Sequence, residues 1–191
     1  MTRLPRTLAA ALIAGATATS AHADAALWQG FYGGLSVGAV NPTVPAATVD
    51  PEIAPGYAIF AGYNHALGPN WVLGGELSYG MSGTHSMAPS PTTITMENTL
   101  TASIRGGYAF GNSLVYARLG YQTTDVEVST SIGDFEAEGM VYGLGLEQML
   151  AENLSARIEY THADMDLRRI GFPNTTNFDT DTISVGIAFH F

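Results

Sequence analysis

The last ten residues, Thr182–Phe191, read TISVGIAFHF and alternate between large apolar side chains and small or polar ones. Successive side chains of a β-strand point to opposite faces, so a period of two predicts a strand with one apolar and one polar face. Chain ends usually fray unless another segment ties them down. The sequence therefore predicts that this strand pairs with another and that something covers its apolar face.

Seven upstream stretches show the same two-faced pattern, although Phe60 interrupts it in the second. They span residues 30–40, 56–65, 71–81, 96–110, 114–123, 139–150 and 154–162. The connections alternate between tight turns (ALGPN, GN and AEN, at 66–70, 111–112 and 151–153) and longer polar segments (41–55, 82–94, 125–137 and 164–179). Short and long connections that alternate around an even number of strands are typical of outer-membrane barrels. The prediction is an all-β, eight-stranded antiparallel transmembrane β-barrel, with short periplasmic turns and long extracellular loops.

The start of the chain indicates export. Arg3 and Arg6 precede an apolar run, and Ala21-His22-Ala23 has the small-x-small pattern of a signal-peptidase site. We expect residues 1–23 to be a cleaved signal peptide and 24–191 to form one barrel domain. The chain contains no Cys, which excludes disulfides, and its net charge of −10 argues against nucleic acid as a partner.

Alternation alone does not say which face points inward, because a soluble lipocalin-like barrel would show the same period with its apolar face inside. Two observations favour lipid on the apolar face. The polar face is rich in Gly, Ser, Thr and Ala, which suits the narrow interior of an eight-stranded barrel. The apolar face carries aromatic residues at two heights, as interfacial girdles do. The lower girdle is Phe31, Tyr63, Trp71, Phe110 and Phe191, and the upper girdle is Tyr57, Tyr79, Tyr121, Tyr142 and Tyr160.

Six charged residues fall on the polar face, a few positions above the short turns: Glu76, Arg105, Arg118, Glu147, Arg157 and Glu159. Three Arg and three Glu can neutralise one another, and buried charges need such partners. We expect an interior charge network that blocks the barrel, with Arg118 paired to Glu76.

Three stretches resemble the small porin-family, OmpA-like surface proteins of Gram-negative bacteria: WQGFYGGLSVGAV, IRGGYAFGNSLVYARLGY and ISVGIAFHF. The resemblance implies a cell outer membrane location, with lipopolysaccharide and the outer-membrane assembly machinery as partners. It also implies that the C-terminal pattern of Val185, Ile187, Phe189 and Phe191 is the assembly signal. The periplasmic peptidoglycan-binding domain of full-length OmpA-type proteins is not expected here.

Few residues suggest chemistry. His85 and Ser86 are neighbours in a long connection, where a nucleophile–base pair would lack a third group to orient the base. His162 is placed where a barrel deacylase would hold its base, but position 164 is Asp rather than Ser. His65 and His190, near the periplasmic rim, suggest no chemistry. No His and carboxylate group has metal-ligand spacing, and no cofactor is expected.

The long connections are acidic, through Asp50, Glu52, Asp125, Glu127, Asp134, Glu136, Asp164, Asp166, Asp179 and Asp181, with Arg168 and Arg169 as their basic residues. A solvated surface is favoured over weak divalent-cation binding. The sequence thus predicts a non-enzymatic outer-membrane protein with a structural or surface-interaction role in envelope integrity, adhesion or host contact. The alternatives are a small diffusion porin and, less favoured, a lipid A-modifying enzyme.

Overall fold

Eight long antiparallel strands form the molecule in a computed structural model that describes residues 25–43, 52–86, 92–129, 135–169 and 175–191. A short 3-10 turn, η2 (Ala25–Trp28), precedes them, and a two-residue strand, β4 (His85–Ser86), lies beside the start of β5. Among these residues, no helix is long and apolar enough to cross a membrane. The long strands are β1 (Gly30–Thr43), β2 (Ala54–Ala66), β3 (Trp71–Ser82), β5 (Thr93–Phe110), β6 (Ser113–Val128), β7 (Phe135–Ala151), β8 (Leu154–Arg169) and β9 (Thr175–His190).

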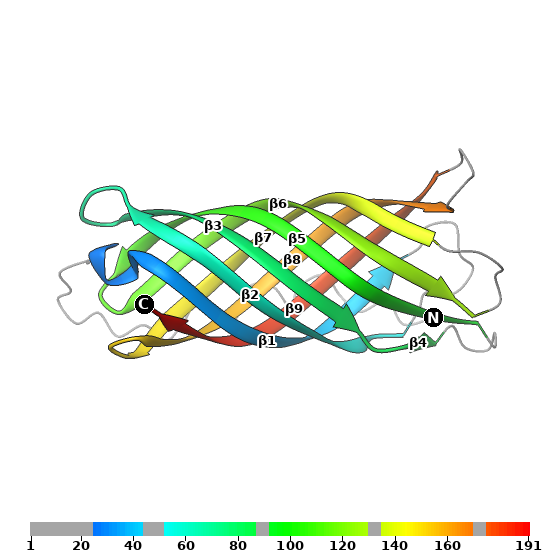
Figure 1. Cartoon of the computed structure of the whole chain (residues 1–191), viewed down its shortest axis with the longest axis horizontal. Coiled ribbons are helices and arrows are strands. Elements are labelled where there is room, and N and C mark those ends of the chain that lie inside the picture. The colour runs from blue at the N-terminus through cyan, green and yellow to red at the C-terminus, as the bar shows by residue number, and fades with distance from the viewer. Residues whose placement is uncertain (1–24, 44–51, 87–91, 130–134, 170–174) are drawn as a thin grey trace, which may run out of the picture.

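The sheet closes on itself. Each long strand pairs with its neighbour in the sequence, β3 pairs with β5, and β1 pairs with β9 (Figure 1). In the β1–β9 seam Leu35 lies opposite Ile187, and the Phe191 N–H donates a 2.9 Å hydrogen bond to the Phe31 carbonyl. The eight-stranded antiparallel barrel predicted from the sequence is confirmed, and the last strand is held because it completes the closure.

The three short turns lie at the end of the barrel that also holds the C-terminus (Figure 1). Gly111 adopts φ 58° at the first position of the two-residue β5–β6 turn, a conformation that glycine adopts without strain. Gly68, with φ 91°, serves the β2–β3 turn in the same way.

The strands are longer than predicted at the other end. They run for 12 to 18 residues, whereas about 9–11 residues suffice for a tilted strand to span a bilayer. Asp125, Glu127, Glu136, Asp164, Asp166, Asp179 and Asp181 therefore lie on strands rather than in loops, which corrects the sequence-based assignment. These strand ends could not be recognised from an apolar outer face, because a strand that projects into water has polar residues on that face.

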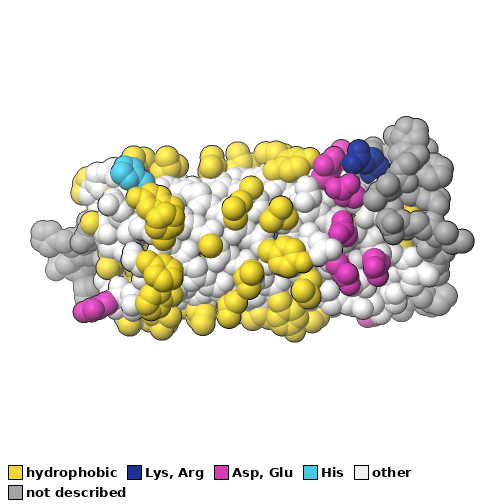
Figure 2. Space-filling view, in the orientation of Figure 1, with side chains coloured by type: hydrophobic (Ala, Val, Ile, Leu, Met, Phe, Trp, Pro, Cys, Tyr) yellow, Lys and Arg dark blue, Asp and Glu magenta, His cyan; other side chains and the backbone are white. Residues whose placement is uncertain are grey.

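The outer wall is apolar along most of its length, with polar side chains or glycine inside. Phe31, Leu35 and Val37 point outward from β1, and Tyr32 between them is buried. Figure 2 shows apolar side chains spread over the wall and an acidic band beyond them, towards the end with the long connections. Phe60, which breaks the alternation of β2, is buried inside the barrel.

At the level of the acidic band, the inner face of the barrel becomes apolar and the outer face becomes polar. There the interior is filled by an apolar cluster of Ile94, Met96, Val126, Ala137, Val141, Ala163, Met165 and Phe178. The outward side chains at the same strand ends are acidic, for example Asp125, Glu127 and Asp179. This reversal is the pattern of a water-soluble barrel, and we define its outward carboxylates (Glu97, Asp125, Glu127, Glu136, Glu138, Asp164, Asp166, Asp179 and Asp181) as the acidic belt.

The opposite end is filled by η2 and its neighbours. Trp28 is completely buried in an apolar cluster with Val72, Leu114 and Met149. The Ala25 N–H donates to the Pro69 carbonyl at 2.9 Å, which holds the turn beneath the barrel. The sequence analysis began the first strand at Gly30 and did not anticipate that Trp28, just before it, enters the interior.

Candidate functional site: a charge network inside the barrel

The six charged residues predicted to face inward do so, from β3, β5, β6, β7 and β8, and each is at most 8% exposed. Inward side chains come from every second residue of a strand, and the strand register brings these residues to similar depth. Arg105 and Arg118 lie directly opposite each other on β5 and β6. Because two like charges face each other there, each guanidinium needs carboxylates from other strands.

Glu76 is the centre of the network. Its carboxylate lies 2.7 Å from Arg157 Nη1, 3.4 Å from Arg118 Nη1 and 3.9 Å from Arg105 Nη1. The tyrosine hydroxyl of Tyr32 also donates to Glu76 at 3.0 Å. One carboxylate therefore serves three arginines, of which Arg157 is the nearest.

The other two carboxylates each bind one arginine closely. Glu159 Oε1 accepts from Arg118 Nη1 at 2.7 Å, and Glu147 Oε2 accepts from Arg105 Nη1 at 3.0 Å. The nearest partner of Arg118 is thus Glu159 rather than Glu76, although Glu76 is within salt-bridge distance. Sequence position had suggested Glu76, because Arg118 and Glu76 lie at the same height above the short turns.

Aromatic and amide groups complete the network. The ring of Phe60 lies 3.4 Å beneath the guanidinium of Arg157, and the Tyr32 ring lies 4.3 Å from that of Arg105. Tyr116 donates its hydroxyl to Glu159 at 2.8 Å, and Asn64 accepts from Arg105 Nε at 2.9 Å. The sequence analysis did not include these residues in the network. Three of them could have been found from their positions on the polar face, and Phe60 from the break that it makes in the alternation.

His190 extends the network toward the short-turn end. Its Nε2 lies 3.0 Å from Ser155 Oγ and 3.3 Å from Glu147 Oε1, and its ring stacks on Tyr32. Trp28 contacts the same imidazole edge-on. His190 therefore points inward and contacts the charged network, whereas the sequence analysis placed it only near the periplasmic rim. The stacking on Tyr32 depends on the closing of the barrel, because Tyr32 and His190 are paired across the β1–β9 seam.

The predicted girdle residues lie on the outer wall. Among the lower set, Phe31 packs against Tyr63, and Trp71 packs edge-on against Tyr108, which the sequence analysis had not included in the girdle. Phe110 is half-buried. The upper set, Tyr57, Tyr79, Tyr121, Tyr142 and Tyr160, is exposed. So are Val185, Ile187, Phe189 and Phe191 of the C-terminal pattern.

The two histidine candidates for chemistry lie far from the charge network, near the other end of the barrel. His85 is buried in β4 rather than in a loop, and contacts Ser82 Oγ at 2.9 Å and the Glu52 carbonyl at 2.8 Å. His162 lies on the outer wall, with Nδ1 2.9 Å from Asp181 Oδ1. Within the described ranges, no three His, Cys, Asp or Glu residues are arranged to hold a metal ion. Asp50 and Asp134 lie outside the described residues.

One protein family matches almost the whole chain. The family described as outer membrane protein beta-barrel domain matches residues 7–191. The chain belongs to this family. The outer-membrane barrel and the outer-membrane location predicted from the sequence are thereby supported.

Individual relatives are more distant. The 22 kDa outer membrane protein of Rhizobium leguminosarum bv. viciae is 27% identical over 143 residues, which cover 71% of this chain and 66% of that protein, just under two thirds of its length. Neisserial surface protein A superposes with a TM-score of 0.66 at 16% identity, over 85% of this chain and 98% of the other. Ail, the attachment invasion locus protein of Yersinia pestis, gives 0.56 at 12% identity, over 85% and 100%. At these identities the two structures show the fold alone.

Proposed function

We propose that this outer-membrane barrel has a structural and surface-interaction role and that its charge network closes the bore to solutes. The salt bridge between Glu76 and Arg157 is the observation that carries the proposal, because it joins strands on opposite sides of the barrel. Beneath it, the buried indole of Trp28 fills the periplasmic end. An eight-stranded interior is just wide enough for side chains to fill, and these side chains are fixed by charge pairing.

Conductance in planar lipid bilayers tests the closed bore. We expect the purified barrel to give no stable openings of porin size. A variant that combines Glu76→Ala with Arg157→Ala should show more current than the native chain, because it removes the bridge across the bore. An Arg168→Ala variant is the matched control, since Arg168 lies at the extracellular end and is about half exposed. Steady porin-sized openings of the native protein would overturn the proposal and favour a small diffusion porin.

The surface-interaction role rests on the charge of the extracellular end. The acidic belt runs across strands β5–β9 just beyond the upper girdle, and Arg168 lies 3.4 Å from Glu136 within it. Carboxylates at this height suit cationic surfaces and disfavour polyanions. Ail has been crystallised with the heparin analogue sucrose octasulfate, and the belt of this chain argues for the opposite preference.

Binding in lipid nanodiscs tests this preference. We expect the barrel to bind immobilised polylysine more strongly than heparin, with an affinity that falls as salt is added. A variant carrying Asp164→Asn and Asp166→Asn should bind polylysine more weakly, whereas Glu152→Gln at a periplasmic turn should behave as the native chain. Stronger binding to heparin than to polylysine would contradict the proposal.

A further inference from the structure

A shallow apolar groove crosses the outer wall of the barrel at the closing seam. Most of its lining consists of outward side chains of β8, β9 and β1, among them Ala156, Ile158, Val185, Ile187, Leu35 and Val37. Val185 is paired with Val37 across the β1–β9 seam and with Ile158 on its other side. The groove therefore spans the junction between the first and the last strand, on the face that we assign to lipid.

Two residues of β8 lie at the floor of the groove. Ala156 and Ile158 are half-buried, whereas Leu154 and Tyr160, which point outward from the same strand on either side of them, are exposed. Ala156 is paired with Ile187, a larger side chain that is 53% exposed. An alanine beside larger side chains leaves a depression in the apolar wall. An acyl chain fills such a depression with close methylene contacts, and no polar group of the wall loses a hydrogen bond.

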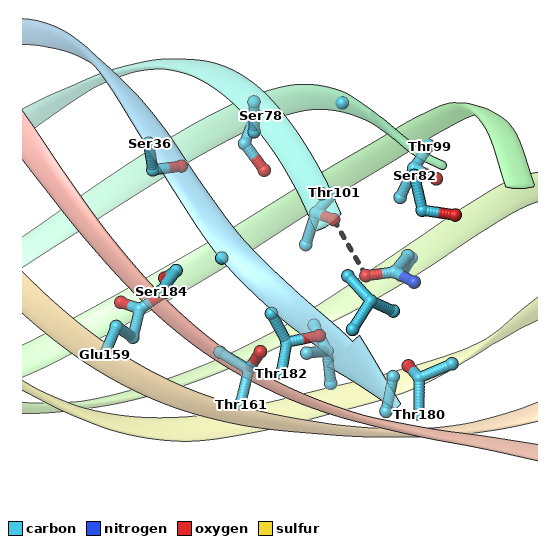
Figure 3. Close-up of a pocket in the computed structure, with 18 of the residues that line it drawn as sticks. Ser36, Ser78, Ser82, Thr99, Thr101, Glu159, Thr161, Thr180, Thr182 and Ser184 are labelled. Atoms are coloured by element: carbon cyan, nitrogen blue, oxygen red, sulfur yellow. Dashed lines mark hydrogen bonds between the residues drawn. The ribbon is translucent and has the colours of Figure 1, made fainter. Parts of the chain in front are cut away.

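The outward residues of β8 and β9 continue from the groove to a polar group at the upper girdle. Beyond the groove, two outward pairs lie toward the extracellular end: Tyr160–Ile183 and His162–Asp181. Thr161, Thr182 and Ser184 alternate with these residues and line the cavity inside the barrel (Figure 3). Asp181 is separated from Val185 by about 14 Å along β9, at about 3.4 Å per residue. The glycerol backbone and first methylene groups of a lipid span such a distance.

Asp181 is the acceptor of this polar group. Its Oδ1 accepts a 2.6 Å hydrogen bond from the Tyr160 hydroxyl and lies 2.9 Å from His162 Nδ1. Its other oxygen, Oδ2, accepts no hydrogen bond from the described residues, and the side chain is 39% exposed. The next outward pair on these strands is also acidic, Asp164 with Asp179. An anionic headgroup is therefore disfavoured here, and an ammonium group that donates to Oδ2 is favoured.

We propose that the groove and Asp181 together form a binding site for one membrane lipid whose headgroup carries a primary ammonium group. An acyl chain of this lipid lies in the groove over Ala156 and Ile158. Its ammonium group donates a hydrogen bond to Asp181 Oδ2 at the membrane surface. Tyr160 and His162 hold the carboxylate through Oδ1, which leaves Oδ2 to the lipid. The bound chain packs against β8, β9 and β1 and so covers the closing seam.

Native mass spectrometry of the barrel with lipids of identical acyl chains tests the headgroup. Phosphatidylethanolamine carries a primary ammonium, phosphatidylcholine a quaternary one without N–H donors, and phosphatidylglycerol none. We expect the first lipid to bind phosphatidylethanolamine-selectively, with an affinity roughly threefold or more above that of the other two, as one charge-assisted hydrogen bond at an exposed site allows. Asp181→Asn should abolish this preference, whereas Asp125→Asn, in the acidic belt on β6, should keep it. Equal affinities of the three lipids for the native chain would overturn the proposal.

Filling the groove tests the place of the acyl chain. Ala156→Phe puts a large side chain on the floor of the groove and leaves Asp181 intact, so the affinity for phosphatidylethanolamine should fall severalfold. Ala117→Phe, at an exposed outward alanine of β6, is the matched control and should bind as the native chain does. Equal binding by the two variants would contradict the proposal. So would native dimers without lipid preference that Ala156→Phe dissociates, because the groove would then join two copies of this chain. If Ala156→Phe fails to fold, the three lipids on the native chain still decide.

Discussion

Arg157 on β8 and Glu76 on β3 form a salt bridge across the full width of the barrel, with Arg157 Nη1 2.7 Å from Glu76 Oε2. Three strands separate β3 from β8 in either direction around the closed sheet, so the two residues stand on opposite walls. The bridge therefore constrains the cross-section of the barrel, which hydrogen bonds between neighbouring strands do not do alone.

Removal of either partner of this bridge should destabilise the folded barrel. Glu76→Ala or Arg157→Ala leaves a buried charge without its closest partner, which costs about 3–5 kcal/mol of unfolding free energy. The double variant should lose less than the sum of the two. Denaturant unfolding in detergent or lipid vesicles measures all three. The exposed pair of Arg168 and Glu136, 3.4 Å apart, is the control and should contribute roughly 0–1 kcal/mol. Fully additive effects of the buried pair would contradict this account.

Deletion of Phe191 should impair assembly more than stability. Its side chain is 80% exposed, and its contacts are one backbone hydrogen bond to Phe31 and an edge-on contact with Phe189. We propose that the outer-membrane assembly machinery reads this terminal pattern. We therefore expect a marked fall in outer-membrane level and a small change in the unfolding midpoint of barrels that form. Phe191→Tyr, which keeps an aromatic residue at the last position, provides the control. Equal outer-membrane levels of native and truncated chains would refute this.

The extracellular rim should become less stable in acid through His85. Burial lowers the pKa of His85 below its usual value, and this effect outweighs its hydrogen bond to the Glu52 carbonyl, which raises the pKa. The neutral form is therefore favoured in the folded state. The stability that neutral His85 gives the rim is fully present above the ordinary histidine pKa of about 6.5. It is lost as the pH falls below that value and through the lower pKa of His85 in the folded protein.

Hydrogen exchange of the β4–β5 rim at pH 7.5 and pH 5.0 measures this effect, after correction for the intrinsic pH dependence of exchange. Protection should fall in acid for the native chain and change less in His85→Asn, which cannot titrate. All other residues are the same in both proteins, so the difference between them isolates His85. An identical pH response would show that His85 has no part in the effect.

Added salt should stabilise the barrel at its extracellular end. Asp125 lies opposite Glu136, and Asp164 lies opposite Asp179, with each pair facing outward. Like charges at opposed positions on neighbouring strands destabilise a sheet, and salt screens exposed charges. The unfolding midpoint should therefore rise with sodium chloride. Asp164→Asn should raise the midpoint at low salt and weaken its salt dependence; a midpoint that falls with salt in the native chain would count against repulsion.

Overproduction of the protein should leave the acylation of lipid A unchanged. His162 shares Asp181 with the hydroxyl of Tyr160, which donates to the same carboxylate oxygen at 2.6 Å. Considering only the described residues, no serine or threonine hydroxyl is hydrogen-bonded to His162, and a deacylase needs such a nucleophile. Mass spectrometry of lipid A decides. A lost acyl chain that returns to normal levels with His162→Ala would establish an enzymatic activity.

The alternating period predicted the barrel and the residues that share a face, because side-chain direction follows from position along a strand. The small residues of the polar face and the two levels of aromatic residues then predicted that the apolar face is outside and the six charges are inside. The pairing of those charges could not be predicted in the same way. Glu76 meets Arg157 across the bore and 81 residues along the chain, so its choice depends on barrel width and on tilt. Trp28 was missed because a 3-10 turn of four residues has no period to recognise. The acidic strand ends were taken for loops because their outer face is polar.

Because the outer face is acidic at the acidic belt, the strand ends there extend out of the bilayer into water. Between Tyr121 of the upper girdle and Val128, β6 continues for seven residues, which at about 3.4 Å per residue and a tilt of about 40° adds roughly 18 Å of height. That height places the extracellular end of β6 well beyond the level of the upper girdle. Shortening these strand ends by two residues on every strand would lower the extracellular end of the barrel without altering the membrane-spanning wall. The height of that end and the anchoring of the barrel in the membrane therefore depend on different parts of the strands.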